Sequence, residues 1–171
     1  DTSADAPTDV DLKADLTDDV ALVTGATRGI GAEIAAELAD LGATVFAGAR
    51  DPDDVTASDQ HAIQLDVTED DDIEAAVDRI EREQGSLDVL VNNAGVQTET
   101  TAAAATMDDW EFVVETDFRA YWLCAKHAAG HMPEGGTILN VSSNHAFLTM
   151  PGLFPYNAVK AGINGMTRAM A

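Results

Sequence analysis

Positive charge is the scarcest feature of this 171-residue chain. Nine Lys and Arg stand against 31 Asp and Glu, which gives a formal net charge of −22. So few scattered cations cannot neutralise a track of phosphates, which argues against nucleic-acid binding, and docking onto an anionic membrane is disfavoured for the same reason. No apolar run approaches the ~18–20 residues of a transmembrane helix. We therefore expect neither a nucleic-acid nor a membrane partner.

Cysteine is nearly absent as well, because Cys124 is the only one. A single thiol permits neither an intramolecular disulfide nor a CxxC site. Cys124 lies in an apolar helical stretch, residues 121–125, where a small buried side chain is far more common than a nucleophile. His127 and His131 stand near a predicted helix end without a surrounding HExxH motif, so we expect no metal site.

The acidic excess favours a folded protein with a carboxylate-covered surface over a disordered chain. Disorder requires few apolar residues, whereas apolar residues make up 46% of this sequence. Only residues 1–15, which contain five Asp, are predicted to form a disordered acidic arm. A carboxylate-rich surface repels itself in dilute buffer and is screened by salt. We therefore expect a protein of a salt-rich cytoplasm.

Residues 16–171 are predicted to form one α/β domain in which strands and helices alternate. Short apolar runs predict strands at 20–23, 44–48, 63–65, 87–91 and 137–141. Helical periodicity predicts helices near 30–41, 68–84, 106–130 and 156–171. Thr68 and Asp71 resemble a capping box at the start of the second helix. Thr106 is expected to cap the third.

The predicted strands are apolar on both faces, which indicates a parallel sheet covered by helices on both sides. Right-handed crossovers then predict a Rossmann-like, doubly wound fold of three layers with strand order 3-2-1-4-5. The fifth strand is expected at an open edge of the sheet, where an apolar strand is an aggregation liability.

A glycine-rich turn, residues 24–31, joins the first predicted strand to the first predicted helix. Its three glycines permit a tight turn and let backbone N–H groups approach a pyrophosphate. The following helix N-terminus favours the negative charge, although such turns also occur without a ligand. The turn predicts dinucleotide contacts from Gly25, Thr27, Arg28, Gly29, Ile30 and Gly31.

Tyr156 and Lys160 are i and i+4 on the last predicted helix and therefore share one face. A tyrosine with the reference pKa of about 10 is a poor acid–base catalyst near neutrality, and a nearby lysine cation favours the phenolate. Ser143 follows the fifth strand at its carboxyl edge, where ligands bind in parallel sheets. Alone, the Tyr–Lys pair is more typical of an exposed helix face. Beside Ser143 and the glycine-rich turn, it indicates proton transfer to a carbonyl or alcohol oxygen.

Together, TGxxxGxG at 24–31, Asn-Asn-Ala-Gly at 92–95, Ser143 and Tyr156-x-x-x-Lys160 resemble the short-chain dehydrogenase/reductase family from residue 16 onward. The resemblance implies that Tyr156 donates a proton, Ser143 polarises the carbonyl, and Lys160 anchors the ribose and assists the tyrosine. It also implies cofactor contacts from Asp66, Val67, Asn93, Ala94 and Gly95. A capping role for Asp66 and a plain Asn-Gly turn at 92–95 are the alternatives.

One position departs from the family pattern. Many members carry an asparagine in the helix after the fourth strand, whose backbone holds a water of a proton relay, and here this position is Asp117. Because the role depends on backbone geometry, an aspartate can serve it. A carboxylate near Lys160 would also pair with the ammonium and dilute its effect on Tyr156.

Cofactor preference is predicted from the end of the second strand. NAD-preferring relatives place an acidic residue there, which accepts a hydrogen bond from the ribose 2′-OH. In this chain Ala49 takes that position, Arg50 follows it, and Arg28 adds a second guanidinium, a pair that suits a 2′-phosphate. We expect NADP(H), with NAD(H) as the alternative because Asp51 follows directly.

These residues predict an oxidoreductase that moves hydride between a nicotinamide and a carbonyl or secondary alcohol, with Tyr156 as general acid/base. The apolar loop after Ser143 suggests a partly apolar small-molecule substrate, which His145 could contact. The resemblance further implies a homotetramer or smaller homo-oligomer built from helices 106–130 and 156–171. Family members continue beyond the last helix, so we expect a C-terminally incomplete domain. The alternative function is a dinucleotide-binding but inactive fragment or regulatory module.

Overall fold

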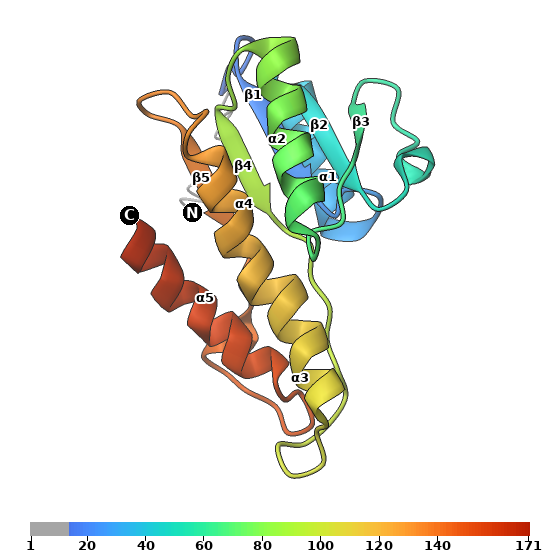
Figure 1. Ribbon diagram of the computed structural model, residues 1–171, viewed down its shortest axis with the longest axis vertical. Coiled ribbons are helices and arrows are strands. Elements are labelled where there is room, and N and C mark those ends of the chain that lie inside the picture. Colours follow the sequence, from blue (N-terminus) through green and yellow to red (C-terminus); the bar gives the residue numbers. More distant parts are fainter. Residues whose placement is uncertain (1–13) are drawn as a thin grey trace, which may run out of the picture.

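Five parallel strands form the centre of the protein (Figure 1). The structure, a computed structural model, describes residues 14–171, so the predicted acidic arm lies outside the described residues except for its last two positions. The strands are β1 (Val20–Thr24), β2 (Thr44–Ala49), β3 (His61–Gln64), β4 (Val89–Asn92) and β5 (Thr137–Asn140). Their spatial order is β3-β2-β1-β4-β5, and all neighbouring pairs are parallel. The predicted doubly wound order is confirmed.

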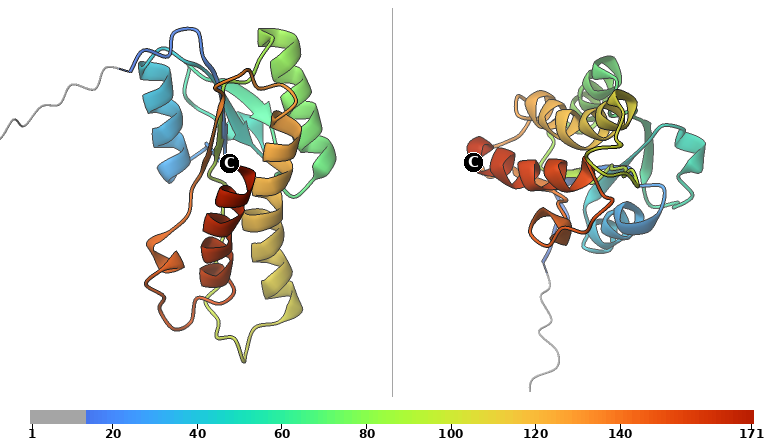
Figure 2. Two further views of the ribbon diagram at one scale, coloured as in Figure 1. Left: turned by 90° about the vertical axis from the view of Figure 1, so that its left-hand side faces the viewer. Right: turned by 90° about the horizontal axis from the view of Figure 1, so that it is seen from below.

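Helices cover both faces of this sheet, as the apolar strands predict. The main helices are α1 (Gly29–Asp40), α2 (Asp70–Gln84), α3 (Met107–Val113), α4 (Ala120–Ala128) and α5 (Tyr156–Met170). Figure 2 shows α1 on one side of the sheet and α2 with α4 on the other. Two single-turn 3-10 helices, η1 (Pro52–Asp54) and η3 (Asn144–Ala146), lie in loops.

Each face of the sheet has its own apolar core because successive strand residues point to opposite faces. In β1, Leu22 packs into the core shared with α2 and α4, whereas Val23 packs into the core shared with α1. Cys124 belongs to the first core and is buried, and burial raises the pKa of its thiol to about 12. The prediction that Cys124 is a buried side chain of the core is confirmed.

The predicted helix over 106–130 is interrupted by a π-helical segment, η2 (Val114–Arg119), between α3 and α4. Within it the N–H of Ala120 donates to the carbonyl of Glu115, an i to i−5 hydrogen bond. Thr106 caps α3 as expected, in a capping box with Asp109. The π segment widens one turn of the helix, and it carries Asp117 toward α5.

The capping box predicted for Thr68 and Asp71 is wrong. The N-cap of α2 is Glu69, and no side chain caps this helix. Instead, the N–H and Oγ1 of Thr68 donate to Oδ1 of Asp66, at 3.0 and 2.7 Å. Asp66, two residues after β3, therefore closes the turn before α2, and Thr68 is its hydrogen-bond donor.

The strand β5 lies at the edge of the sheet, as expected. Its burial alternates, and Leu139 exposes 47% of its surface although its neighbour Ile138 is half-buried. Beyond this edge α5 lies beside α4 and η2, where Val159 and Ile163 of α5 pack against Val113 and Tyr121 (Figures 1 and 2). Over residues 14–171, no helix combines the length and the apolar character needed to cross a membrane.

Candidate active site

The glycine-rich turn between β1 and α1 is packed too closely for any larger residue at Gly31. A Cβ placed there would lie 2.3 Å from the carbonyl oxygen of Gly25 and 2.4 Å from Nδ2 of Asn93. Gly25 adopts a left-handed backbone conformation, with φ 65°, and so does Gly29, with φ 57°. These conformations favour glycine, which explains the spacing of glycines in the turn.

The turn that follows β4 holds the glycine-rich turn in place. Nδ2 of Asn93 donates to the carbonyl oxygens of Thr24 and Gly25, at 2.9 and 3.2 Å. Oγ1 of Thr24 in return accepts from the backbone N–H groups of Asn93 and Ala94, at 2.9 and 3.0 Å. Four hydrogen bonds therefore join the carboxyl ends of β1 and β4, where the sequence predicts the cofactor.

The start of α1 has the features that an anionic ligand requires. Its N-cap is Arg28, and no side chain forms a cap hydrogen bond. No atom lies within 4 Å of where a Cβ of Gly29 would be, and Ile30 exposes 66% of its surface. The start of α1 thus borders open space, which suits a pyrophosphate. The residues present therefore fit a dinucleotide.

Both predicted guanidiniums are exposed at this end of the sheet. Arg28 and Arg50 form no ion pair with any residue in the range 14–171. Asp51, the carboxylate that argued for NAD(H), accepts a hydrogen bond from the N–H of Asp53 at 3.0 Å and caps η1. This carboxylate is therefore used in a local turn directly after the strand.

The third predicted segment of the cofactor site lies at the end of β3. Asp66 is half-buried and binds Thr68, and its N–H donates to Oδ2 of Asp72 at 3.0 Å. Val67 is buried, with 7% of its surface exposed. Asp66 thus closes the turn before α2 but does not cap the helix, whose N-cap is Glu69, and contact with an adenine stays a prediction.

Lys160 lies on α5 with its ammonium group buried against three oxygen atoms. Nζ is 3.0 Å from Oδ2 of Asp117, 3.1 Å from the carbonyl oxygen of Val141 and 3.4 Å from the hydroxyl oxygen of Tyr121. The same atom lies 5.6 Å from the centre of the Tyr156 ring. The pairing of Asp117 with Lys160 that the sequence raised as a concern is therefore present.

Asp117 is fully buried in the π-helical segment. Its Oδ1 accepts from the backbone N–H of Val96 at 2.7 Å, while Oδ2 faces Lys160. Burial raises the pKa of this carboxyl group, and the charge of Lys160 and the bond from Val96 act in the opposite direction. A Cβ at Gly95 would lie 3.0 Å from Oδ2, so glycine at this position gives the carboxylate its space.

Ser143 and Tyr156 stand on either side of the loop that follows β5. Oγ of Ser143 accepts from the N–H of His145 at 3.1 Å and donates to Oδ1 of Asn144 at 3.2 Å, so it caps η3. Tyr156 is half-buried at the start of α5, and its ring meets that of His145 edge-on at 6.4 Å between centres. His145 therefore lies beside the predicted proton donor.

A cavity of about 220 Å³ connects the two halves of the predicted site. Its lining includes Ile30, Asn93 and Gly95 from the turns, and Asp117, Tyr156 and Lys160 from the helices. Ser142 also lines it, whereas the predicted Ser143 does not. The structure thus places the glycine-rich turn and the Tyr–Lys pair around one space, with Ser143 directly outside it.

Three partners of this site were not predicted from the sequence. The buried Tyr121 touches Lys160, and its hydroxyl donates to the carbonyl of Val141 at 3.2 Å. Ser142 donates to the backbone carbonyl of Lys160 at 2.9 Å. Tyr121 is i+4 from Asp117 on one helix, a spacing that could have indicated their common face. The carbonyl of Val141 carries no signal in the sequence.

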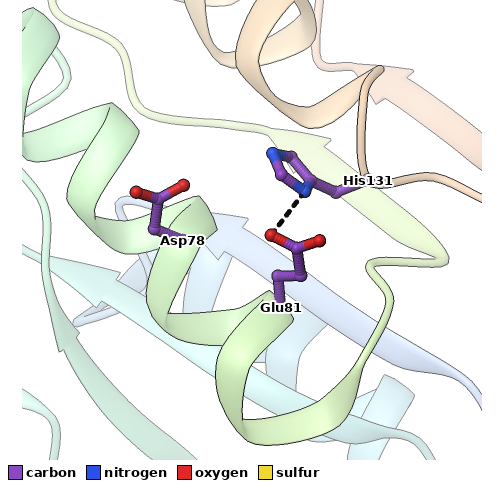
Figure 3. Close-up of side chains that lie close together, drawn as sticks. All are labelled: Asp78, Glu81 and His131. Atoms are coloured by element: carbon purple, nitrogen blue, oxygen red, sulfur yellow. Dashed lines mark ion pairs between the residues drawn. The ribbon is translucent and has the colours of Figure 1, made fainter.

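A group of possible metal ligands lies away from this cavity, at the surface between α2 and the loop after α4 (Figure 3). Asp78, Glu81 and His131 bring ligand atoms within 4.8 Å of one another. Both carboxylates are exposed, and Nδ1 of His131 is 2.9 Å from Oε2 of Glu81, so an ion pair accounts for that contact. His127 pairs separately with Asp70, at 2.9 Å. The two histidines that the sequence placed together therefore have different partners.

Comparison with known proteins agrees with the fold. The model of the short chain dehydrogenase family matches residues 19–171. The chain is 42% identical to cis-4-hydroxycyclohexanecarboxylate dehydrogenase of Sinomonas cyclohexanicum, over 89% of this chain and 66% of that protein. It is 35% identical to gluconate 5-dehydrogenase of Gluconobacter oxydans, over 88% and 63% respectively. It therefore spans slightly less than two thirds of these curated relatives.

A solved structure shows the same likeness in three dimensions. The ligand-free aldohexose dehydrogenase of Thermoplasma acidophilum superimposes with a TM-score of 0.86 at 33% identity, over 91% of this chain and 61% of that one. The chain belongs to the short-chain dehydrogenase family, as the sequence motifs indicated.

Proposed function

We propose that this chain carries the cofactor-binding and proton-transfer residues of an NADP(H)-dependent oxidoreductase. Its substrate would be a small carbonyl compound or the corresponding secondary alcohol. The observation that supports this most directly is the cavity lined by both Asn93 and Gly95 of the β4 turn and by Tyr156 and Lys160 of α5. Membership of a family whose relatives are named dehydrogenases supports the same reaction class.

The cofactor and the protein would supply different parts of the reaction: hydride transfer and proton transfer, respectively. When bound, the nicotinamide supplies the hydride or accepts it. In the direction of reduction, the hydroxyl of Tyr156 donates its proton to the substrate oxygen, and in oxidation the phenolate takes that proton back. Ser143 would donate a hydrogen bond to the same oxygen once its hydroxyl leaves Asn144. Lys160 would stand beside Tyr156 and hold the ribose.

NADPH is expected to be used with a kcat/KM at least about tenfold higher than NADH, because Arg28 and Arg50 can grip a 2′-phosphate bidentately. Substitution Arg50→Ala should raise the Kd for NADPH about tenfold or more and leave that for NADH nearly unchanged. Fluorescence titration measures both constants, and oxidation of NADPH with a panel of ketones and aldehydes measures turnover.

The matched control is Arg82→Ala, which removes an exposed arginine from the last turn of α2. It should change neither Kd. Equal kcat/KM with NADH and NADPH would contradict the cofactor assignment. Tight NADPH binding without turnover of any compound in the panel would instead favour the inactive binding module.

Salt should stabilise the fold, because carboxylates dominate its surface and the net charge is −22. We propose that the protein works in a salt-rich cytoplasm. Raising KCl from 0.1 to 1 M shortens the Debye length from about 10 to about 3 Å, which screens the repulsion between surface carboxylates. The Tm should rise by roughly 5 °C or more over this range. A parallel series in sucrose, which strengthens burial without screening charge, separates the two effects. A flat Tm in KCl would refute the assignment.

We also infer a homo-oligomer that uses the α3–α4 face and α5, in line with the family resemblance. Large apolar side chains are exposed on these helices at Met107, Trp110, Phe112, Trp122 and Met170. A second copy of the chain would remove this apolar surface from water.

A further inference from the structure

The ion pair of Asp117 and Lys160 is buried beside Tyr156. The carboxylate is 0% exposed and the lysine side chain 5%, and Nζ lies 3.0 Å from Oδ2. An ammonium group has three N–H donors and no acceptor. Here three oxygens surround it, from Asp117, the Val141 carbonyl and Tyr121. Protein oxygen atoms therefore hold the ammonium group of Lys160 before any cofactor binds.

Such a pair changes what Lys160 does to its neighbours. A lone ammonium near a phenol favours the phenolate, whereas an ammonium with a carboxylate at contact distance presents little net charge. We propose that Asp117 is a positioning residue that balances the charge of Lys160, so that the pair, rather than the lysine alone, sets the pH at which Tyr156 exchanges its proton. This inference rests on the proposed function.

A second phenol, that of the buried Tyr121, lies beside the pair, with its hydroxyl oxygen 3.4 Å from Nζ of Lys160. Burial raises the pKa of Tyr121 strongly, and the negative charge of Asp117 adds to that rise. The other titratable groups around the pair are Cys124 on α4, which is buried, and His145 on η3, whose ring faces Tyr156. Toward β5 the pair contacts the uncharged carbonyl of Val141.

The chain offers a clean measurement, because Tyr121 and Tyr156 are its only tyrosines. Burial raises the pKa of Tyr121. In Tyr156→Phe only Tyr121 can form a phenolate, so this variant supplies the baseline from which the phenolate absorbance of Tyr156 is read. Substitution Asp117→Asn removes the negative charge and leaves that of Lys160. The midpoint of the phenolate signal should fall by about one pH unit, which is tenfold more phenolate at a fixed lower pH.

Two controls isolate the effect. Glu115→Gln removes another carboxylate of the π segment, one that pairs with Arg119 at the surface, and should leave the midpoint unchanged. Repeating the comparison in a His145→Gln background removes the other titratable ring beside Tyr156. A midpoint that stays in place or rises in Asp117→Asn would overturn the proposal.

A double variant covers the case in which Lys160 without a counterion prevents folding. D117N/K160M leaves neither charge buried alone. If the pair is balanced, its removal should move the midpoint by no more than a few tenths of a pH unit. A rise of the midpoint by a full pH unit would mean that Lys160 stabilises the Tyr156 phenolate despite its pairing with Asp117, and it would overturn the proposal.

Neither titration needs cofactor or substrate, so the inference and the proposed function can fail separately. If the midpoint shifts as expected but no substrate is turned over, the proposed function is contradicted and the inference about Asp117 still holds. With turnover, the alkaline limb of the pH profile of kcat for carbonyl reduction, in which Tyr156 must be protonated, should move to lower pH in Asp117→Asn. A merely structural role of Asp117 would lower stability and leave that limb in place.

Discussion

Substitution Tyr156→Phe should lower kcat for carbonyl reduction about 10³-fold, because it removes the proposed proton donor and little else. The ring of Tyr156 lines the cavity and packs against apolar residues of α5 and η2, contacts that phenylalanine can keep. We therefore expect the Kd for NADPH and the free energy of unfolding to remain close to those of the unaltered protein. Initial rates, fluorescence titration and urea denaturation measure the three quantities.

The other tyrosine provides a matched control. Tyr121→Phe also removes one hydroxyl, but a buried one that donates to Val141 and touches Lys160. It should cost about 1–2 kcal/mol of stability and change kcat far less than Tyr156→Phe does. If Tyr156→Phe keeps a tenth or more of the activity, then another group supplies the proton.

The fold could be predicted almost completely because its signals are local. Runs such as Val20–Thr24 are apolar on both faces, and only a doubly covered sheet buries them in that form. The start of α2 was predicted wrongly because Thr68 has an aspartate on either side in the sequence. It could bond to Asp71 in the helix as a cap, but in the structure it bonds to Oδ1 of Asp66 instead. Sequence spacing cannot decide between two such partners.

Only those site residues whose side chains belong to a sequence motif could be predicted. Tyr156, Lys160 and the glycines stand in recognisable spacings, and the structure places them around one cavity. The partners of Lys160 depend on the path of the chain instead. The carbonyl of Val141 has no side-chain signature, and no motif in the sequence indicates the π segment that presents Asp117 to Lys160 of α5.

The scarcity of positive charge also bears on cofactor association. A surface of net charge −22 repels an anionic dinucleotide at long range. Arg28 and Arg50, both exposed beside the glycine-rich turn, act against this at short range. Salt screens the distant carboxylates more than a direct guanidinium–phosphate contact. The same ionic conditions would therefore serve both the stability of the fold and its encounter with the cofactor.

Gly31→Ala should disrupt both the fold and the cofactor site. The new Cβ would lie 2.3 Å from the Gly25 carbonyl oxygen and 2.4 Å from Nδ2 of Asn93, so α1 or the turn must move. Movement breaks the two hydrogen bonds that Asn93 donates to Thr24 and Gly25. Overpacking and two lost hydrogen bonds together should cost about 3–5 kcal/mol. We expect the Tm to fall by roughly 10 °C and the Kd for NADPH to rise more than 100-fold.

The control for this variant is Gly165→Ala on α5, where no atom lies within 4 Å of the added Cβ. Replacing an exposed helical glycine by alanine should stabilise the protein by up to about 1 kcal/mol. Both variants add one methyl group to a helix, so a difference between them isolates the close approach of the two turns. Full NADPH affinity in Gly31→Ala would show that the contact between Gly31, Gly25 and Asn93 does not shape the cofactor site. In that case the dinucleotide would have to bind away from the start of α1.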